Sequence, residues 1–169
     1  LRTSPRDERD LMIMAKNSWI LAFDNLSTMQ PWLSDAICRL ATGGGFGTRE
    51  LYTDSEESLF DSQRSVVVNG IGDIATRDDF RDRALIINLS PIPEDQRKDE
   101  ETFWHEFNEV KPKILGALLD GVSTGLKNLP EVRLNCLPRM ADFAKWITAV
   151  EPAFDWSPGS FMKAYFQNR

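Results

Sequence analysis

Two runs of apolar residues with no polar alternation place the strongest constraint on how this chain can fold. Residues 19–23 read Trp-Ile-Leu-Ala-Phe and residues 66–68 read Val-Val-Val, and polar residues follow each run at once. Strands of this kind are covered on both faces, which is typical of parallel sheets with helices on either side. The sequence therefore predicts an α/β fold with a buried parallel sheet.

Helical spacing of apolar residues predicts the helices that flank this sheet. Ser4 and Pro5, followed by acidic residues, are expected to start a helix that runs to about Lys16. Pro31 is expected near the start of a second helix, which the glycines within residues 43–47 end.

Further strand-like segments precede the helical part of the chain. Residues 48–53 and 58–60 flank an acidic stretch and are predicted to pair as a surface hairpin. Residues 84–89 are mostly aliphatic and are predicted to form a last strand, after a short helical turn at residues 78–83.

The composition changes near residue 91 and divides the predicted organisation in two. Residues 1–91 are predicted to form the α/β core, and residues 92–169 an all-helical C-terminal subdomain. The segments with helical periodicity are residues 100–110, 112–126, 138–150 and 159–166. The stripe expected to form the core of this subdomain consists of Trp104, Phe107, Val110, Ile114, Leu115, Leu118 and Leu119.

The overall charge limits the kinds of partner this chain can have. It carries 20 basic and 26 acidic side chains, a net charge of −6, so any contact with phosphate has to be local. The apolar runs are too short to span a bilayer and the first residues lack a signal-peptide pattern, so we expect a cytoplasmic protein without membrane contact. Cys38 and Cys136 fit no metal-binding pattern and are expected to be buried thiols.

Polar residues at the strand ends form the candidate site. Asp24 and Asn69 each follow a predicted apolar strand, and ligands of open α/β sheets bind at the carboxyl ends of strands. Asp24 suits a magnesium–nucleotide site, although Asp at this position also caps turns. Asn69 can hold a water near a phosphate without adding charge. Arg83, just before the predicted last strand, can reach towards a phosphate of a neighbouring subunit.

Five segments of the chain carry a family resemblance through their order and content. They are residues 19–25 (WILAFDN), 37–44 (ICRLATGG), 48–52 (TRELY), 66–70 (VVVNG) and 82–87 (DRALII). Together they resemble the superfamily-three helicases and related AAA+ P-loop ATPases of phage and mobile-element primase-helicase proteins. The resemblance implies the C-terminal part of an ATPase core followed by a helical lid. It also implies that the intact protein binds ATP and Mg²⁺, assembles as a homo-oligomeric ring and acts on DNA.

The resemblance gives a role to each matching residue. Asp24 corresponds to the Walker B acid, which orders Mg²⁺, and Asn69 to the sensor-one amide near the γ-phosphate. Arg83 corresponds to the arginine finger offered to the adjacent subunit, with Arg81 as the second candidate. Asn25 occupies the position of the carboxylate that polarises the attacking water.

Three other residues are implicated by the same resemblance. Arg139 stands where helical lids often place an arginine against the nucleotide, and its alternative role is that of a surface or capping residue. Arg49 and Tyr52 lie in the segment that leads into the DNA-facing hairpin, so they are the candidate DNA contacts.

Several departures from the family pattern shape the functional expectation. Asn25 orients water but is a poor base, so hydrolysis is expected to be slow, lost or dependent on another group. The hairpin tip carries Asp54, Glu56 and Glu57 where a pore loop offers a basic residue, which argues against DNA tracking by this tip. No GxxxxGK[ST] pattern occurs, and the glycines of residues 43–47 lack the lysine and are read as a flexible joint.

The missing phosphate loop leads to an expectation about the sheet. In the family the loop precedes the Walker B strand, so it is expected before Leu1. Its strand would lie between residues 65–69 and 84–89, and without it the open strand edges favour instability or edge pairing. The piece alone is then expected to be inactive.

Two classes of function follow from these observations. The first is an ATP-dependent DNA helicase of a mobile element, which couples hydrolysis to unwinding or translocation; Asp24, Asn69 and Arg83 favour it. The alternative, favoured by Asn25, is a non-hydrolysing nucleotide-binding assembly or DNA-maintenance module with a degenerate ATPase site. A free-standing α/β domain with unrelated chemistry requires the motif order to be chance.

Overall fold

The computed structural model describes residues 2–44, 46–49, 57–60 and 63–167. The chain divides into two compact units, Leu1–Ala84 and Leu85–Arg169. The division falls slightly before residue 91, where the composition changes.

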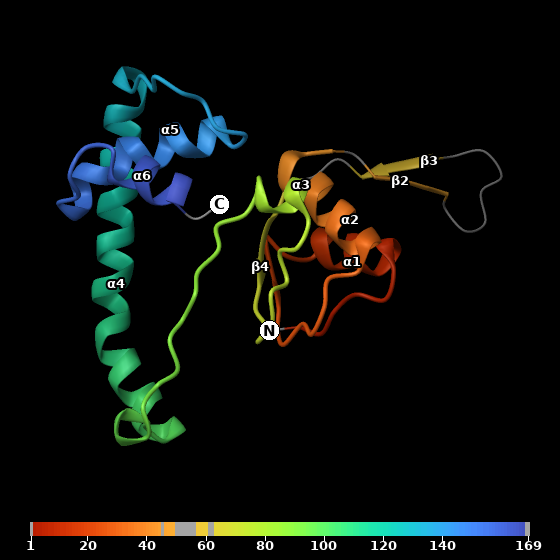
Figure 1. Cartoon of the computed structure of the whole chain (residues 1–169), viewed down its shortest axis with the longest axis horizontal. Helices are drawn as coiled ribbons and strands as arrows, with labels where there is room; N and C mark the ends of the chain where they lie inside the picture. Colours follow the sequence, from red (N-terminus) through yellow and green to blue (C-terminus); the bar gives the residue numbers. More distant parts are fainter. Residues whose placement is uncertain (1, 45, 50–56, 61–62, 168–169) are drawn as a thin grey trace. The chain divides into compact units, whose positions relative to one another are not determined.

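The first unit combines short strands with helices (Figure 1). Its elements are α1 (Glu8–Lys16), β1 (Ile20–Phe23), α2 (Pro31–Thr42), β2 (Phe46–Arg49), β3 (Glu57–Phe60), β4 (Ser65–Val68) and α3 (Asp78–Arg81). The helix that begins at Pro31 and the helical turn near residue 78 are confirmed. Gly43 ends α2 in the left-handed conformation (φ 77°), so the glycine-rich segment begins as a helix cap.

β1 and β4 are adjacent parallel strands, as the apolar runs predict. Their register pairs Leu21 with Val66 and Phe23 with Val68. On the other edge of β1, Arg2 forms an isolated parallel bridge with Phe23. β2 and β3 pair in antiparallel register, which confirms the pairing expected of the hairpin; the connecting residues 50–56 lie outside the described residues.

Helices cover one face of the β1–β4 pair. Leu21 and Phe23 are fully buried against apolar residues of α1 and α2. The alternate positions point the other way, and Ile20 and Val67 are 62% and 56% exposed. The prediction that these strands are buried on both faces is therefore wrong for this unit. What packs against the second face is a tertiary property that an apolar run alone does not encode, and within this unit apolar side chains on that face are exposed.

Two predicted elements of this unit differ in the structure. The first helix begins at Glu8, because Asp7 caps it by accepting a hydrogen bond from the backbone of Asp10 (2.8 Å). The backbone of Arg2 instead forms hydrogen bonds with Ala22 and Asp24 beside β1, so the chain is extended there. The predicted start of the first helix at Ser4 is therefore wrong. Residues 84–89 are not a strand: a strand needs a paired neighbour for its backbone, and no pairing is described for this segment. Leu85, Ile87 and Leu89 are exposed there.

The second unit is helical, as predicted (Figure 1). Its elements are η1 (Glu94–Gln96), α4 (Glu100–Asn128), η2 (Leu129–Glu131), α5 (Ala141–Val150), η3 (Glu151–Phe154) and α6 (Ser160–Gln167). The predicted helical segments 100–110 and 112–126 belong to one helix, since α4 is 29 residues long and includes Pro112. Proline removes a single helical hydrogen bond, which a long helix tolerates at a cost.

The apolar stripe of α4 is not the core of this unit. Within it, Trp104, Leu115 and Leu118 are about half exposed, at 49%, 57% and 56%. The packed face instead carries Gly121 and Gly125, where a Cβ at Gly125 would come within 2.8 Å of Val150 in α5. The two glycines allow this close contact between α4 and α5. A search for periodic large apolar residues does not reveal such small residues.

The two cysteines differ from each other. Cys38 in α2 is buried, as expected, whereas Cys136 is exposed, so that half of the expectation is wrong. Cys136 lies in an irregular segment between η2 and α5.

Candidate functional site

The ends of β1 and β4 are joined by three hydrogen bonds. The Asn69 N–H donates to the Phe23 carbonyl (3.1 Å), and the Asn69 carbonyl accepts from Leu26 N–H (2.9 Å). The Asn69 side-chain oxygen accepts from the backbone N–H of Asn25 (2.7 Å). One side chain thereby fixes the turn that follows the neighbouring strand.

Asp24 lies at the same edge of the sheet as Asn69. The two residues follow the paired positions Phe23 and Val68, so they are neighbours across the two strand ends. The backbone N–H of Asp24 donates to the Arg2 carbonyl (2.9 Å), while Asp24 itself is exposed to solvent. The structure thus brings together the acid and the amide that the sequence singled out.

Asn25 adopts a left-handed backbone conformation, with φ 53°. Asparagine is among the few residues with a side chain that tolerate this region. The conformation turns the Asn25 N–H towards Asn69, so the residue has a structural task in addition to any chemical one.

Gly70 allows the two loops to approach each other. A Cβ at this position would lie 2.2 Å from the Leu26 carbonyl oxygen and 2.5 Å from Cδ1 of Ile74. No side chain fits in that space, so glycine is required for the geometry around Asn69.

The polar groups at these strand ends suit an anionic ligand that carries a hydrated cation. The Asn69 oxygen accepts a hydrogen bond from Asn25, and the amide NH₂ group can donate to a ligand. The exposed Asp24 carboxylate fits Mg²⁺, which commonly keeps several waters and binds through one or two carboxylates and substrate phosphates. Within the described ranges, no group of three or more His, Cys, Asp and Glu side chains is arranged for metal binding.

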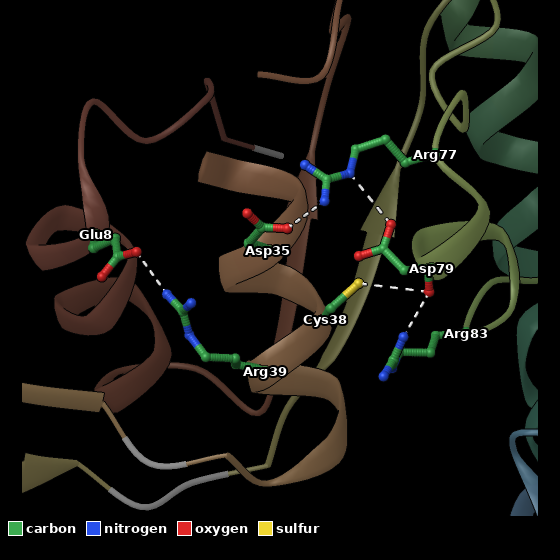
Figure 2. A network of polar contacts seen from close by, with 7 residues as sticks. All are labelled: Glu8, Asp35, Cys38, Arg39, Arg77, Asp79 and Arg83. Atoms are coloured by element: carbon green, nitrogen blue, oxygen red, sulfur yellow. Dashed lines mark hydrogen bonds and ion pairs between the residues drawn. The ribbon is translucent and has the colours of Figure 1, made fainter. Parts of the chain in front are cut away.

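Arg83 is held by its own chain (Figure 2). Its guanidinium donates to the Asp79 carbonyl (2.7 Å), and its Nε is buried without a hydrogen-bond partner. The thiol of Cys38 lies 3.8 Å from the same carbonyl oxygen. To act as an arginine finger, Arg83 would have to leave this carbonyl, so that role stays a prediction.

An ion-pair network that the sequence did not suggest ties α3 to α2 and α2 to α1 (Figure 2). Arg77 bridges Asp35 (2.8 Å) and Asp79 (3.2 Å), and Arg39 pairs with Glu8 (2.6 Å). All of these side chains are partly exposed, so each pair adds little stability. The partners are far apart in sequence in two of the three pairs, and no local spacing could have revealed them.

The remaining predicted site residues lie elsewhere. Arg139 is exposed in the second unit, in the turn before α5. Arg49 is the last residue of β2; its side chain, and Tyr52 altogether, fall outside the described residues.

A comparison with protein families identifies the class of protein to which this chain belongs. The family model of the actinomycete integrative conjugative element replication protein matches residues 1–165. The chain therefore belongs to that family, and it is a replication protein of a mobile element. No curated protein and no solved structure matches it. In the part of the chain that the structure describes, no helix combines the length and the apolar character needed to cross a membrane.

Proposed function

We propose that this chain is part of an ATP-dependent DNA helicase or translocase of its mobile element, with the nucleotide bound at the ends of β1 and β4. The observation that carries the proposal is the hydrogen bond from Asn25 N–H to the Asn69 side chain, which holds the amide beside Asp24. This polar pair lies at the carboxyl ends of adjacent parallel strands, and open α/β sheets bind their ligands at those ends. The family's role in replication supports DNA as the partner.

Each residue at the strand ends has a distinct role in this proposal. Asp24 holds a hydrated Mg²⁺, which supplies charge neutralisation to the phosphates when it is bound. The Asn69 NH₂ group donates to a terminal phosphate oxygen. Arg83 reaches a neighbouring copy in a ring after release from Asp79. Arg49 and Tyr52 contact DNA.

A second function, the non-hydrolysing nucleotide-binding module, is favoured by Asn25. Its side chain is neutral, and its backbone N–H is committed to Asn69. An amide can orient the attacking water of ATP hydrolysis, but it is a poor acceptor for the proton that this water must lose. In this alternative the nucleotide controls assembly or DNA maintenance by binding alone.

ATP turnover of the full-length protein, with and without single-stranded DNA, distinguishes the two functions. Under the helicase proposal, Asp24→Asn lowers turnover about 10- to 100-fold, and Asp95→Asn, which removes an exposed carboxylate in η1, leaves it unchanged. Asn25→Asp is expected to raise turnover, because it restores a carboxylate in a conformation that Asp tolerates. Nucleotide binding without turnover by any of these proteins supports the alternative, and absence of Mg²⁺-dependent binding contradicts both.

A further inference from the structure

An exposed tryptophan lies beside an arginine at the amino ends of β1 and β4. Trp19 directly precedes β1 and Arg64 directly precedes β4, and the first residues of the two strands, Ile20 and Ser65, are paired. The Arg64 guanidinium carbon lies 4.7 Å from the centroid of the Trp19 ring, within the range of a cation–π contact. Trp19 is nevertheless 82% exposed, so the face of the indole away from Arg64 is accessible to a ligand.

Arg64 is fixed in this position by backbone carbonyls. Its Nε–H is shared between the carbonyls of Ala15 (3.0 Å) and Ser18 (2.9 Å), and Nη1 donates to the carbonyl of Gln63 (2.9 Å). These bonds engage the Nε–H and one N–H of Nη1, whereas a guanidinium carries five N–H groups. The same side chain can therefore stay on the ring and donate to a phosphate oxygen.

Arg2 brings a second guanidinium to the same end of the sheet. Its Nη2 donates to Oγ of Ser18 (2.6 Å), the residue whose carbonyl accepts from Arg64. The acidic residues of α1, Glu8 and Asp10, lie in its first turn, at the other end of that helix from Ser18. Positive charge is thus concentrated locally beside Trp19, in a chain whose net charge is −6.

An open aromatic face flanked by guanidinium groups has the chemistry that recognises single-stranded nucleic acid. Bases stack on aromatic side chains, and basic side chains follow the phosphates of the strand. Duplex DNA does not offer such a base, because each base is stacked between its neighbours. The chain belongs to a family of replication proteins, which favours DNA as the polymer.

We propose that Trp19, Arg64 and Arg2 form a contact site for single-stranded DNA, in which a base stacks on Trp19 and the two arginines bind adjacent phosphates. The site precedes β1 and β4, whereas Asp24 and Asn69 follow them, so DNA and nucleotide bind at opposite ends of the strands. The inference rests on the proposed function for its partner, DNA, but it does not depend on nucleotide binding.

The first test measures binding of the full-length protein to fluorescently labelled oligo(dT) by anisotropy, without nucleotide. Trp19→Ala is expected to raise the dissociation constant roughly 5- to 150-fold, the range for loss of one base–aromatic stack. Ile71→Ala removes another fully exposed apolar side chain from the same unit and is expected to leave the constant unchanged. A wild-type protein that does not bind oligo(dT), or equal dissociation constants for the two variants, would overturn the proposal.

The second test uses intrinsic fluorescence and a variant that keeps an aromatic ring. A base stacked on an indole quenches its emission, so oligo(dT) is expected to quench the wild-type protein. In Trp19→Phe the quenching is expected to disappear while binding is largely retained, because phenylalanine also stacks. Equal quenching of the two proteins would show that the base lies on another tryptophan and would overturn the site.

The contribution of Arg2 is tested by the salt dependence of oligo(dT) binding. Arg2→Gln is expected to lower the slope of log K against log salt concentration by about 0.7, the value for one phosphate contact with a single strand. Arg97→Gln, which removes an exposed arginine of the second unit, should keep the wild-type slope. Identical slopes for Arg2→Gln and wild type would contradict the phosphate contact.

Binding of Mg²⁺–ATP to the same proteins separates this inference from the proposed function. Trp19→Ala is expected to bind the nucleotide as the wild type does while its affinity for oligo(dT) falls. Trp19-dependent binding of oligo(dT) by a wild-type protein without affinity for Mg²⁺–ATP would support the DNA site and contradict the nucleotide site. The reverse result, nucleotide binding without an effect of Trp19 on DNA, would overturn the DNA site alone.

Discussion

The side-chain oxygen of Asn69 lies 2.7 Å from the backbone nitrogen of Asn25 and accepts its hydrogen bond, which ties the ends of β1 and β4 together. The bond fixes the amide so that its NH₂ group is available to a ligand. It also holds Asn25 in its left-handed conformation, next to Asp24. Under the proposed function, the fold uses the oxygen of this side chain and the ligand its NH₂ group.

That division can be tested with two substitutions of Asn69. Asn69→Asp keeps an oxygen for the Asn25 N–H but replaces the donor with an anion that repels phosphate. We expect unchanged stability and at least about tenfold weaker binding of Mg²⁺–ATP. Asn69→Ala loses the bond as well and is expected to lower the free energy of unfolding by about 1 kcal/mol. Calorimetric titration and denaturant unfolding measure the two effects; equal nucleotide binding by wild type and Asn69→Asp would contradict the assigned donor.

Gly70 is expected to be intolerant of a side chain. Gly70→Ala forces a Cβ against the Leu26 carbonyl, a backbone atom, and is expected to destabilise the first unit by roughly 1–3 kcal/mol. Gly72→Ala is the matched control two residues away, where an added Cβ meets nothing within 4 Å. Chemical denaturation should show a loss for the first variant and no loss for the second.

Glu151 is expected to be essential for docking α6. Its carboxylate is buried, with the residue 3% exposed, and accepts hydrogen bonds from the N–H groups of Gly159 (2.9 Å) and Phe161 (2.7 Å). In Glu151→Gln one of these donors faces an NH₂ group instead of an oxygen, which costs about 1–3 kcal/mol of stability. Glu131→Gln, an exposed control, should have no effect on the unfolding midpoint. Equal unfolding midpoints for the two variants would contradict a stabilising role for the buried Glu151 carboxylate.

Cys38 is expected to make stability depend on pH in the alkaline range. Burial raises the pKa of its thiol, an effect that the nearby Arg83 charge partly offsets. Because the pKa of the thiol is higher in the folded chain, the stability that the protonated thiol contributes is complete below its unfolded pKa of about 8.5. This stability is lost as the pH rises through the folded pKa. Cys38→Ala should remove this part of the alkaline loss, seen in unfolding curves between about pH 8 and 10.

The same burial is expected to protect Cys38 from alkylation. Cys136 is exposed and should react first with iodoacetamide in the native protein. Mass spectrometry of the labelled peptides distinguishes the two sites. Preferential labelling of Cys38 would show that α2 opens more readily than its buried position indicates.

The sequence was sufficient to predict the features that depend on local pattern. The apolar runs before Asp24 and Asn69 predict two parallel strands, and the strands are adjacent, so the two polar residues meet. What covers the strands is not a local property, and Ile20 and Val67 proved to be exposed. The aliphatic residues 84–89 have strand-forming side chains, yet a strand also needs a paired backbone.

The polar contacts around the site could not have been predicted for a related reason. Arg77 pairs with Asp35 across 42 positions (77 − 35). Such a pair depends on how α3 packs on α2, which spacing along the chain does not encode. The hydrogen bond from Arg83 to the Asp79 carbonyl depends on the same packing and was not predictable from spacing either.

The most direct measurement of the central claim is paramagnetic broadening by Mn²⁺–ATP in the full-length protein labelled with ¹⁵N-asparagine. Asn17 precedes β1 and serves as an internal control at the opposite end of the strand. We expect the backbone signal of Asn25 and the side-chain NH₂ signal of Asn69 to broaden first, while Asn17 stays sharp. Broadening that spares Asn25 and Asn69, or reaches Asn17 equally, would contradict a nucleotide site at the ends of β1 and β4.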